Sequence, residues 1–247
     1  MNSWRTDGRS EGLFILGRLC ERFGLGDTLR YIEEISDAAL TGEFERTIAK
    51  SAPSFATKKF DSVFAFRLYR LALYALVREV KPQNVIETGV LHGMTSAFLL
   101  EALERNGNGT LFSIDLPSPE ADGPANQDGI HAVLPASLTS GWIVPERLRH
   151  RWRLTLGSSQ EKLPEIFRDT SEIDIFLHDS DHTYSIMWDE LVLAWSHLRV
   201  GGYLVCDNVD FSRAFFDLCR RVERVPFVLS APDDQRHAAI RFAIIKK

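Results

Sequence analysis

The 247-residue sequence has few cysteines, no excess of basic residues and no long apolar run. Its three cysteines, Cys20, Cys206 and Cys219, match no zinc or redox spacing, and their sparse, odd number does not indicate a disulfide scaffold. A reducing, cytoplasmic setting therefore fits the composition best. The 29 basic and 34 acidic residues leave a net charge of −5, whereas binding to nucleic acid phosphates usually requires a basic excess. We expect no nucleic acid partner.

The start of the chain is polar and carries no chemistry that its residues reveal. The apolar patch at 13–16 is too short for a signal-peptide core or a membrane span, so we expect no membrane partner. Residues 1–60 contain helical patches, for example at 27–40, and end in a Ser-Ala-Pro-Ser break at 51–54. We expect residues 1–60 to form a helical N-terminal extension or cap, and residues 61–247 to form the main domain.

From residue 62 onward, short apolar runs alternate with segments of helical periodicity. The runs are almost wholly apolar, which is typical of strands buried on both faces. They lie at 84–87, 110–115, 153–156, 174–178 and 202–207, with two further strands near 226–230 and 238–245. Helical patterns lie between them, at 62–80, 95–105, 159–168, 184–198 and 211–221. This alternation predicts an α/β fold: a Rossmann-like, doubly wound, mostly parallel seven-stranded sheet with helices on both faces.

Polar side chains gather where the predicted strands end. In a sheet of this kind, ligands bind beyond the carboxyl ends of the strands. The residues at those ends are Glu87 after the first strand, Asp115 at the end of the second, Asp179 and Asp181 after the fourth, and Asp207 and Asn208 after the fifth. We therefore expect the functional site at this edge of the sheet.

The first strand runs into a loop with two glycines, Gly89 and Gly93, that precedes a helix. Glycine allows a tight turn and a close approach of the backbone to a ligand. A dinucleotide-binding fingerprint would need another glycine two positions after Gly89, and Leu91 stands there instead. An NAD-linked oxidoreductase is therefore the less favoured alternative.

The pattern E-x-G-x-x-x-G in this loop resembles the first motif of class I S-adenosylmethionine (SAM)-dependent methyltransferases. The resemblance implies that Glu87, Gly89, Gly93 and Thr95 lie against the methionine part of SAM. It also implies that Asp115 holds the ribose hydroxyls, because a carboxylate can accept both of their hydrogen bonds.

A second part of the predicted SAM site follows the third strand. Gly157, Ser158 and Ser159 match the region that flanks the adenine in these enzymes, and we also expect Asp179 to contact the cofactor. The alternative is that the glycines form only tight turns and that Asp115 is an exposed strand end.

The segment from Phe176 to Tyr184 reads FLHDSDHTY, and Val205-Cys206-Asp207-Asn208 follows the next strand. Together they resemble the cation-dependent O-methyltransferases of the catechol and caffeoyl-coenzyme A type and their macrolide-sugar and cephalosporin-tailoring relatives. The resemblance covers about 62–247 and implies that Asp179, Asp207 and Asn208 bind Mg²⁺ or Mn²⁺. Such a hard ion prefers oxygen ligands, and it lowers the pKa of a hydroxyl that it coordinates. We therefore predict methyl transfer to a hydroxyl of a small molecule.

The catechol-type enzymes place a lysine three residues after the first metal-binding aspartate, and His182 stands at that position here. The macrolide-sugar relatives resemble this variant more closely. Histidine can act as a general base near neutral pH, so we predict that His182 is the catalytic base. Structural alternatives stay open: Asp179 and Asp181 could cap the following helix, Asp207-Asn208 could be a turn pair, and His182 could lie on the surface.

The acceptor is less clearly defined by the sequence than the cofactor. The irregular segment at 116–150 is expected to cover it, with His131, Trp142 and Trp188 as candidates to line the pocket, although aromatic side chains more often belong to the core. A sugar, natural-product or phenol hydroxyl remains open as the acceptor. We assign no catalytic role to His92 or His178.

Two further alternatives concern the activity itself. The chain could be a non-catalytic SAM-binding partner protein, or it could transfer the methyl group without a metal. By comparison with the related enzymes, we expect a homo-oligomer, either a dimer or larger.

Overall fold

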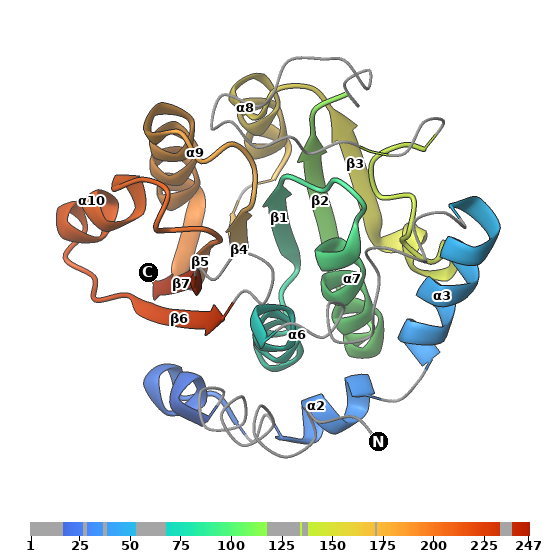
Figure 1. Cartoon of the computed structure of the whole chain (residues 1–247). Coiled ribbons are helices and arrows are strands. Elements are labelled where there is room, and N and C mark those ends of the chain that lie inside the picture. The colour runs from blue at the N-terminus through green and yellow to red at the C-terminus, as the bar shows by residue number, and fades with distance from the viewer. Residues whose placement is uncertain are drawn as a thin grey trace.

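The computed structural model describes residues 17–26, 29–36, 39–52, 68–117, 134, 138–170, 172–232 and 239–247. Its centre is a seven-stranded sheet with the order β3-β2-β1-β4-β5-β7-β6 (Figure 1). The strands are β1 (Asn84–Thr88), β2 (Thr110–Asp115), β3 (Trp152–Leu156), β4 (Ile173–His178), β5 (Leu198–Cys206), β6 (Phe227–Pro232) and β7 (Ala239–Lys246). The first five pair in parallel, and β7 is antiparallel to both β5 and β6. The predicted fold class is confirmed.

Helices cover both faces of the sheet because successive residues of each strand point to opposite sides. Val85 belongs to one hydrophobic core and the next residue, Ile86, to the other. The first core contains residues of α6 (Leu68–Val80) and α7 (Met94–Asn106). The second contains residues of α8 (Ser159–Asp169), α9 (Tyr184–His197) and α10 (Ala214–Arg221). A 3-10 helix, η2 (Glu146–Arg151), precedes β3.

Two element boundaries in the described part of the chain differ from the sequence prediction by three residues or more. Strand β5 begins at Leu198 rather than at 202, and its pairing with β4 is irregular between Ile173 and Ile175. Two glycines lie within this irregularity: Gly201 has a φ of +80°, and a Cβ on Gly202 would lie 2.8 Å from the carbonyl oxygen of Asp174. Helix α10 begins at Ala214 rather than at 211, because the preceding residues form turns.

The N-terminal region is helical where the structure describes it. A helix spans 17–23, followed by α2 (Leu29–Ser36) and α3 (Ala39–Ser51). In Figure 1, α2 lies beside α6 and α3 beside α7. Arg78 of α6 donates from Nε to Glu34 of α2 at 2.7 Å, and the rings of Phe44 and Phe98 lie 6.4 Å apart. The predicted domain boundary falls outside the described residues and stays a prediction.

Within the part of the chain that the structure describes, no helix is both long and apolar enough to cross a membrane.

Candidate active site

Main-chain hydrogen bonds extend the parallel ladder beyond the ends of the strands. The amide of Gly89 donates to Ile114 at 2.9 Å, that of Asp179 to Thr88 at 2.8 Å, that of Asp207 to His178 at 2.9 Å and that of Gly157 to Asp115 at 2.9 Å. The loops after β1, β2, β3, β4 and β5 therefore start side by side. This edge is where the sequence places the site.

The glycine loop needs its glycines for space as well as for backbone conformation. Gly89 has a φ of +85°, and a Cβ there would lie 1.8 Å from the carbonyl oxygen of Asp179. Gly93 has a φ of +87°, and a Cβ there would lie 2.6 Å from the Cα of Gly141. Side chains at these positions would collide with backbone, so the loop can pack this closely only with glycine.

Asp115 ends β2 directly beside this loop. Its Oδ2 accepts a hydrogen bond from the amide of Leu91 at 3.0 Å, and its carboxylate also bonds the hydroxyl of Ser140 and the backbone of Val90 and Leu116. Burial raises the pKa of Asp115 above its usual value in spite of these donors. Its predicted ribose contact is not tested and stays a prediction.

Glu87 is fully buried beneath the loop. Its Oε2 accepts hydrogen bonds from the hydroxyls of Ser96 and Ser113, both at 2.7 Å, and Trp152 Nε1 in turn donates to Ser113 at 2.9 Å. Burial raises the pKa of Glu87 to about 7. These contacts join β1 to α7, β2 and β3, so Glu87 supports the loop from below. A direct contact with the cofactor stays a prediction.

The loop after β3 leads into α8, and its two serines, which the sequence predicts to flank the adenine, also make structural contacts. Ser158 is the N-cap of α8 and accepts from the amide of Glu161 at 3.3 Å. The hydroxyl of Ser159 bonds Glu190. Their adenine contacts are likewise untested.

Two carboxylates, the half-buried Asp179 and the buried Asp207, lie within hydrogen-bonding distance of each other at the ends of β4 and β5. Burial and the charge of Asp207 raise the pKa of Asp179 well above its usual value, and burial raises that of Asp207. The neighbouring Asn208 has a φ of +49°, and its main-chain N–H donates to Asp207 Oδ1 at 2.9 Å. The contact acts in opposite directions on the two acids: the hydrogen bond with Asp179 lowers the pKa of Asp207, whereas the charge of Asp207 makes Asp179 harder to ionise. A nearby positive charge would ease the ionisation of both.

A histidine, His182, and an arginine, Arg70, lie close to this pair of aspartates. His182 Nε2 is 3.4 Å from Asn208 Nδ2, and its ring centre is 5.3 Å from that of Phe211. Arg70, on α6, donates from Nε to Thr95 at 3.2 Å, and its charge lowers the pKa of both aspartates. The sequence prediction included His182 but missed Arg70. A basic residue within the apolar pattern of the predicted helix at 62–80 was the signal that could have identified it.

A second residue that the sequence prediction missed is Glu190 of α9, which is almost completely buried. Its carboxylate accepts from the hydroxyls of Thr88 at 2.6 Å and Ser180 at 2.7 Å, and it pairs with Nδ1 of His178 at 2.7 Å. These bonds, together with the charge of His178, hold the pKa of Glu190 below its usual value despite burial. Glu190 therefore ties the ends of β1 and β4 together behind the candidate site.

The remaining candidate residues lie in different surroundings. Asp181 accepts from the amide of Thr183 at 2.9 Å, a local turn contact before α9. It does not cap that helix, whose N-cap is Thr183. Trp188 stacks on Tyr184, with ring centres 5.9 Å apart, and packs against the second hydrophobic core. Its role in lining the acceptor pocket stays a prediction. Trp142 bonds the glycine loop, and His131 lies outside the described residues.

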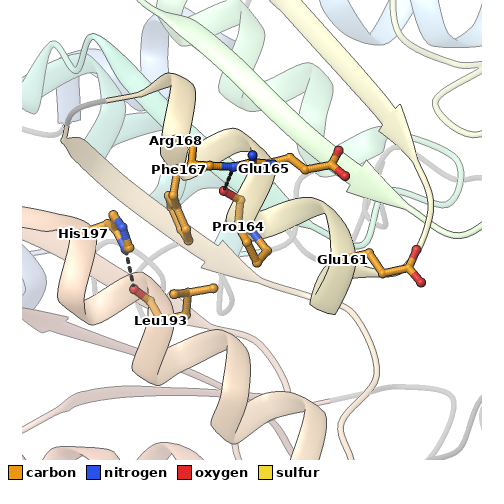
Figure 2. A pocket seen from close by; sticks show the side chains of 7 residues that line it. All are labelled: Glu161, Pro164, Glu165, Phe167, Arg168, Leu193 and His197. Carbon is orange, nitrogen blue, oxygen red and sulfur yellow. Dashed lines mark hydrogen bonds between the residues drawn. The ribbon is translucent and has the colours of Figure 1, made fainter.

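Hollows elsewhere on the surface do not coincide with this site. One of about 350 Å³ lies between α8 and α9, where the rings of Phe167 and His197 are stacked at 4.4 Å (Figure 2). Another, of about 400 Å³, is lined by charged residues of α2, α6 and α7, including Glu34 and Arg78. Neither is lined by a residue that the sequence assigned to the cofactor, the metal or catalysis.

A family of proteins described as a methyltransferase domain matches residues 86–209, a span of half the chain. The chain belongs to this methyltransferase domain family. The match begins in β1 and ends just after Asn208, so it contains the glycine loop, Asp115, the acidic pair and His182. The recognition of a class I methyltransferase from sequence is confirmed. A comparison with curated protein sequences finds no match.

Solved structures share the fold of this methyltransferase domain. An O-methyltransferase from Bacillus cereus, solved with SAH, has a TM-score of 0.59 and 16% identity, covering 88% of this chain and 96% of its own. The O-methyltransferase TomG from Streptomyces achromogenes, involved in tomaymycin synthesis and solved with SAM, has a TM-score of 0.56 and 16% identity, covering 85% and 90%. At these identities the likeness concerns the fold.

Proposed function

We propose that this protein is a SAM-dependent O-methyltransferase that modifies a hydroxyl of a small molecule. One observation carries the proposal: within a methyltransferase domain, the glycine loop, the carboxylate of Asp115 and the carboxylate pair of Asp179 and Asp207 meet at one edge of the sheet. The fold neighbours from Bacillus cereus and Streptomyces achromogenes, which are O-methyltransferases, support the same reaction class.

In this proposal the cofactor lies across the ends of β1, β2 and β3. Asp115 accepts the two ribose hydroxyls, and the glycine loop from Gly89 to Gly93 approaches the methionine part. Ser158 and Ser159 border the adenine. Closely packed loops suit this role because rigid groups hold the two reacting atoms in line without losing further entropy on binding.

The residues at the ends of β4 and β5 fit a divalent cation. Among the described residues no three His, Cys, Asp or Glu side chains are grouped for a metal, so the set consists of the carboxylates of Asp179 and Asp207 and the amide oxygen of Asn208. Mg²⁺ usually takes few protein ligands and keeps several waters, which agrees with so small a set. Bound there, Mg²⁺ or Mn²⁺ would lower the pKa of an acceptor hydroxyl and orient it.

His182 is the proposed base. Its ring lies beside Asn208 and close to the carboxylate of Asp207, so we place it next to the position where the acceptor hydroxyl would bind. His182 takes the hydroxyl proton while the acceptor oxygen bonds to the methyl carbon and the carbon–sulfur bond breaks. The products are the methyl ether and S-adenosylhomocysteine (SAH).

Isothermal titration of SAH into the wild type and into Asp115→Ala is the first test. We expect the variant to bind at least ten-fold more weakly, which corresponds to about 1.4 kcal/mol. Asp169→Ala, an exposed residue at the end of α8, serves as the matched control and should bind like the wild type. Absence of SAH binding would refute the proposal, and titration with NADH would then test the oxidoreductase alternative.

The metal and the reaction are tested separately with a panel of sugar, natural-product and phenol hydroxyls. If a chelator abolishes turnover and Mg²⁺ or Mn²⁺ restores it, the proposed metal dependence is supported. If turnover survives chelation, the proposed metal site is refuted. Binding of SAH with no turnover on any acceptor favours the non-catalytic SAM-binding alternative. Light scattering on the same samples tests the proposed homo-oligomer.

A further inference from the structure

The segment from Ser140 to Val144, here called the strap, lies directly on the glycine loop. The amide of Gly141 donates to the carbonyl of Leu91 at 2.8 Å, and that of Ile143 donates to the carbonyl of His92 at 3.2 Å. All five residues of the strap are buried. The strap comes from the long connection between β2 and β3, which the sequence suggested would cover the acceptor.

A side-chain contact adds to these backbone bonds. Trp142 Nε1 donates to Nδ1 of His92 at 2.9 Å, and the two rings are perpendicular with centres 5.9 Å apart. The hydrogen bond requires Nδ1 of His92 to be the unprotonated nitrogen of the ring. The side chains of His92 and Trp142 therefore join the strap to the glycine loop.

The strap is also wedged in place sterically. Gly93 and Gly141 pack with their backbones in contact, and a Cβ on Gly141 would lie 2.0 Å from Cη2 of Trp152. Arg149 donates from Nη2 to the carbonyl of Gly141 at 3.0 Å. The strap thus lies between the glycine loop on one side and Trp152 of β3 on the other.

Leu91 connects the strap to Asp115 through its two backbone groups. Its amide donates to Asp115 Oδ2 at 3.0 Å, while its carbonyl accepts from Gly141 at 2.8 Å. Leu91 has a φ of +49°, a left-handed conformation that is uncommon for a residue other than glycine. Such a conformation persists where the surroundings enforce it, and here a hydrogen bond on each side of the residue does so. The hydroxyl of Ser140 bonds the same carboxylate directly.

We propose that Ser140 is a positioning residue for the cofactor, and that the strap holds the carboxylate of Asp115 in the orientation that accepts the ribose hydroxyls. The inference rests on the proposed function, because it concerns the same SAM site. Ser140 and the amide of Leu91 approach the carboxylate from the strap and from the loop. With its direction set by these donors, the carboxylate is preorganised and loses little freedom when the ribose binds.

A double-mutant cycle on SAH affinity tests this inference. Ser140→Ala should weaken SAH binding about five-fold in the wild-type background. In the Asp115→Ala background the same change should alter the dissociation constant by less than about two-fold, because the group through which Ser140 acts is gone. Losses that multiply in the double variant, or an unchanged affinity of Ser140→Ala alone, would overturn the inference.

A second variant covers the case in which Ser140→Ala fails to fold. Trp142→Phe keeps an aromatic ring but removes the donor to His92, and it should weaken SAH binding several-fold. Trp195→Phe on α9, away from the strap, is the matched control and should bind SAH normally. If Trp142→Phe binds SAH as tightly as this control, the hydrogen bond from Trp142 to His92 has no effect on the cofactor site and the inference fails.

The outcomes separate this inference from the proposed function. A wild type that does not bind SAH would refute both. A wild type whose SAH binding depends on Asp115 but not on Ser140 or Trp142 would leave the proposed function intact and overturn only the role of the strap.

Discussion

Replacement of Glu87 by glutamine should change the pH dependence of stability in a direction that the structure determines. The side chain is fully buried, and its pKa is raised from 4.5 to about 7. Below pH 4.5, the pKa of the unfolded chain, the carboxyl is neutral in both states, so folding does not bury a charge. As the pH rises from 4.5 to 7, the unfolded chain loses the proton while the folded chain keeps it, so stability falls.

The size of this loss follows from the shift. One pKa unit corresponds to 1.36 kcal/mol, so ionisation of Glu87 should cost the folded protein about 3 kcal/mol once the pH exceeds 7. Glu87→Gln does not titrate and avoids this loss. Its amide also places a donor where Oε1 has no partner in the described structure, but that cost does not vary with pH. The stability of the variant relative to the wild type should therefore rise by about 3 kcal/mol between about pH 4 and pH 8.

Urea unfolding of the ligand-free protein at several pH values measures this difference, and Glu190→Gln provides a control of opposite sign. The pKa of Glu190 is lowered, so its ionised form stabilises the fold above the unfolded pKa, and this contribution is lost as the pH falls. Glu190→Gln should therefore be most destabilising near neutral pH and less so in acid. Parallel stability curves for Glu87→Gln and the wild type would refute the reasoning about Glu87.

Three further predictions concern the loop, the acidic pair and the N-terminal helices. Gly89→Ala should cost at least about 2 kcal/mol in urea unfolding and abolish SAH binding by calorimetry, because its Cβ would overlap the carbonyl of Asp179; unaltered binding would contradict the close packing. Asp207→Asn should raise the thermal midpoint of the metal-free protein, since it removes one of two facing acids, while turnover falls at least 100-fold; a lower midpoint would argue against repulsion. Phe44→Ala should cost about 3 kcal/mol, because the ring is buried against Phe98, and leave SAH affinity within about two-fold of wild type; a large loss of affinity would show that α3 affects the site.

The sequence by itself determined the architecture and which candidate residues come to one edge of the sheet. Short runs of doubly buried residues can be satisfied only by a sheet covered on both faces, and their order along the chain brings the acids after β1, β2, β4 and β5 to one edge. The glycine spacing in the first loop and the Asp-Asn pair after β5 are local patterns. They can be recognised without knowledge of the residues that pack against them. The family match agrees with the methyltransferase domain that the glycine loop indicated.

Only the tertiary structure decided what surrounds those residues. Arg70 reaches Thr95 from another helix, and Glu190 reaches Thr88 across 102 residues of chain. The strap returns to the glycine loop from the connection between β2 and β3. Periodicity tells which face of an element is apolar, but not which element comes to lie against it. Whether a carboxylate such as Glu87 faces the ligand or lies buried at a pKa of about 7 depends on that packing, because burial and neighbouring charges set the pKa and both arise from residues distant in the chain.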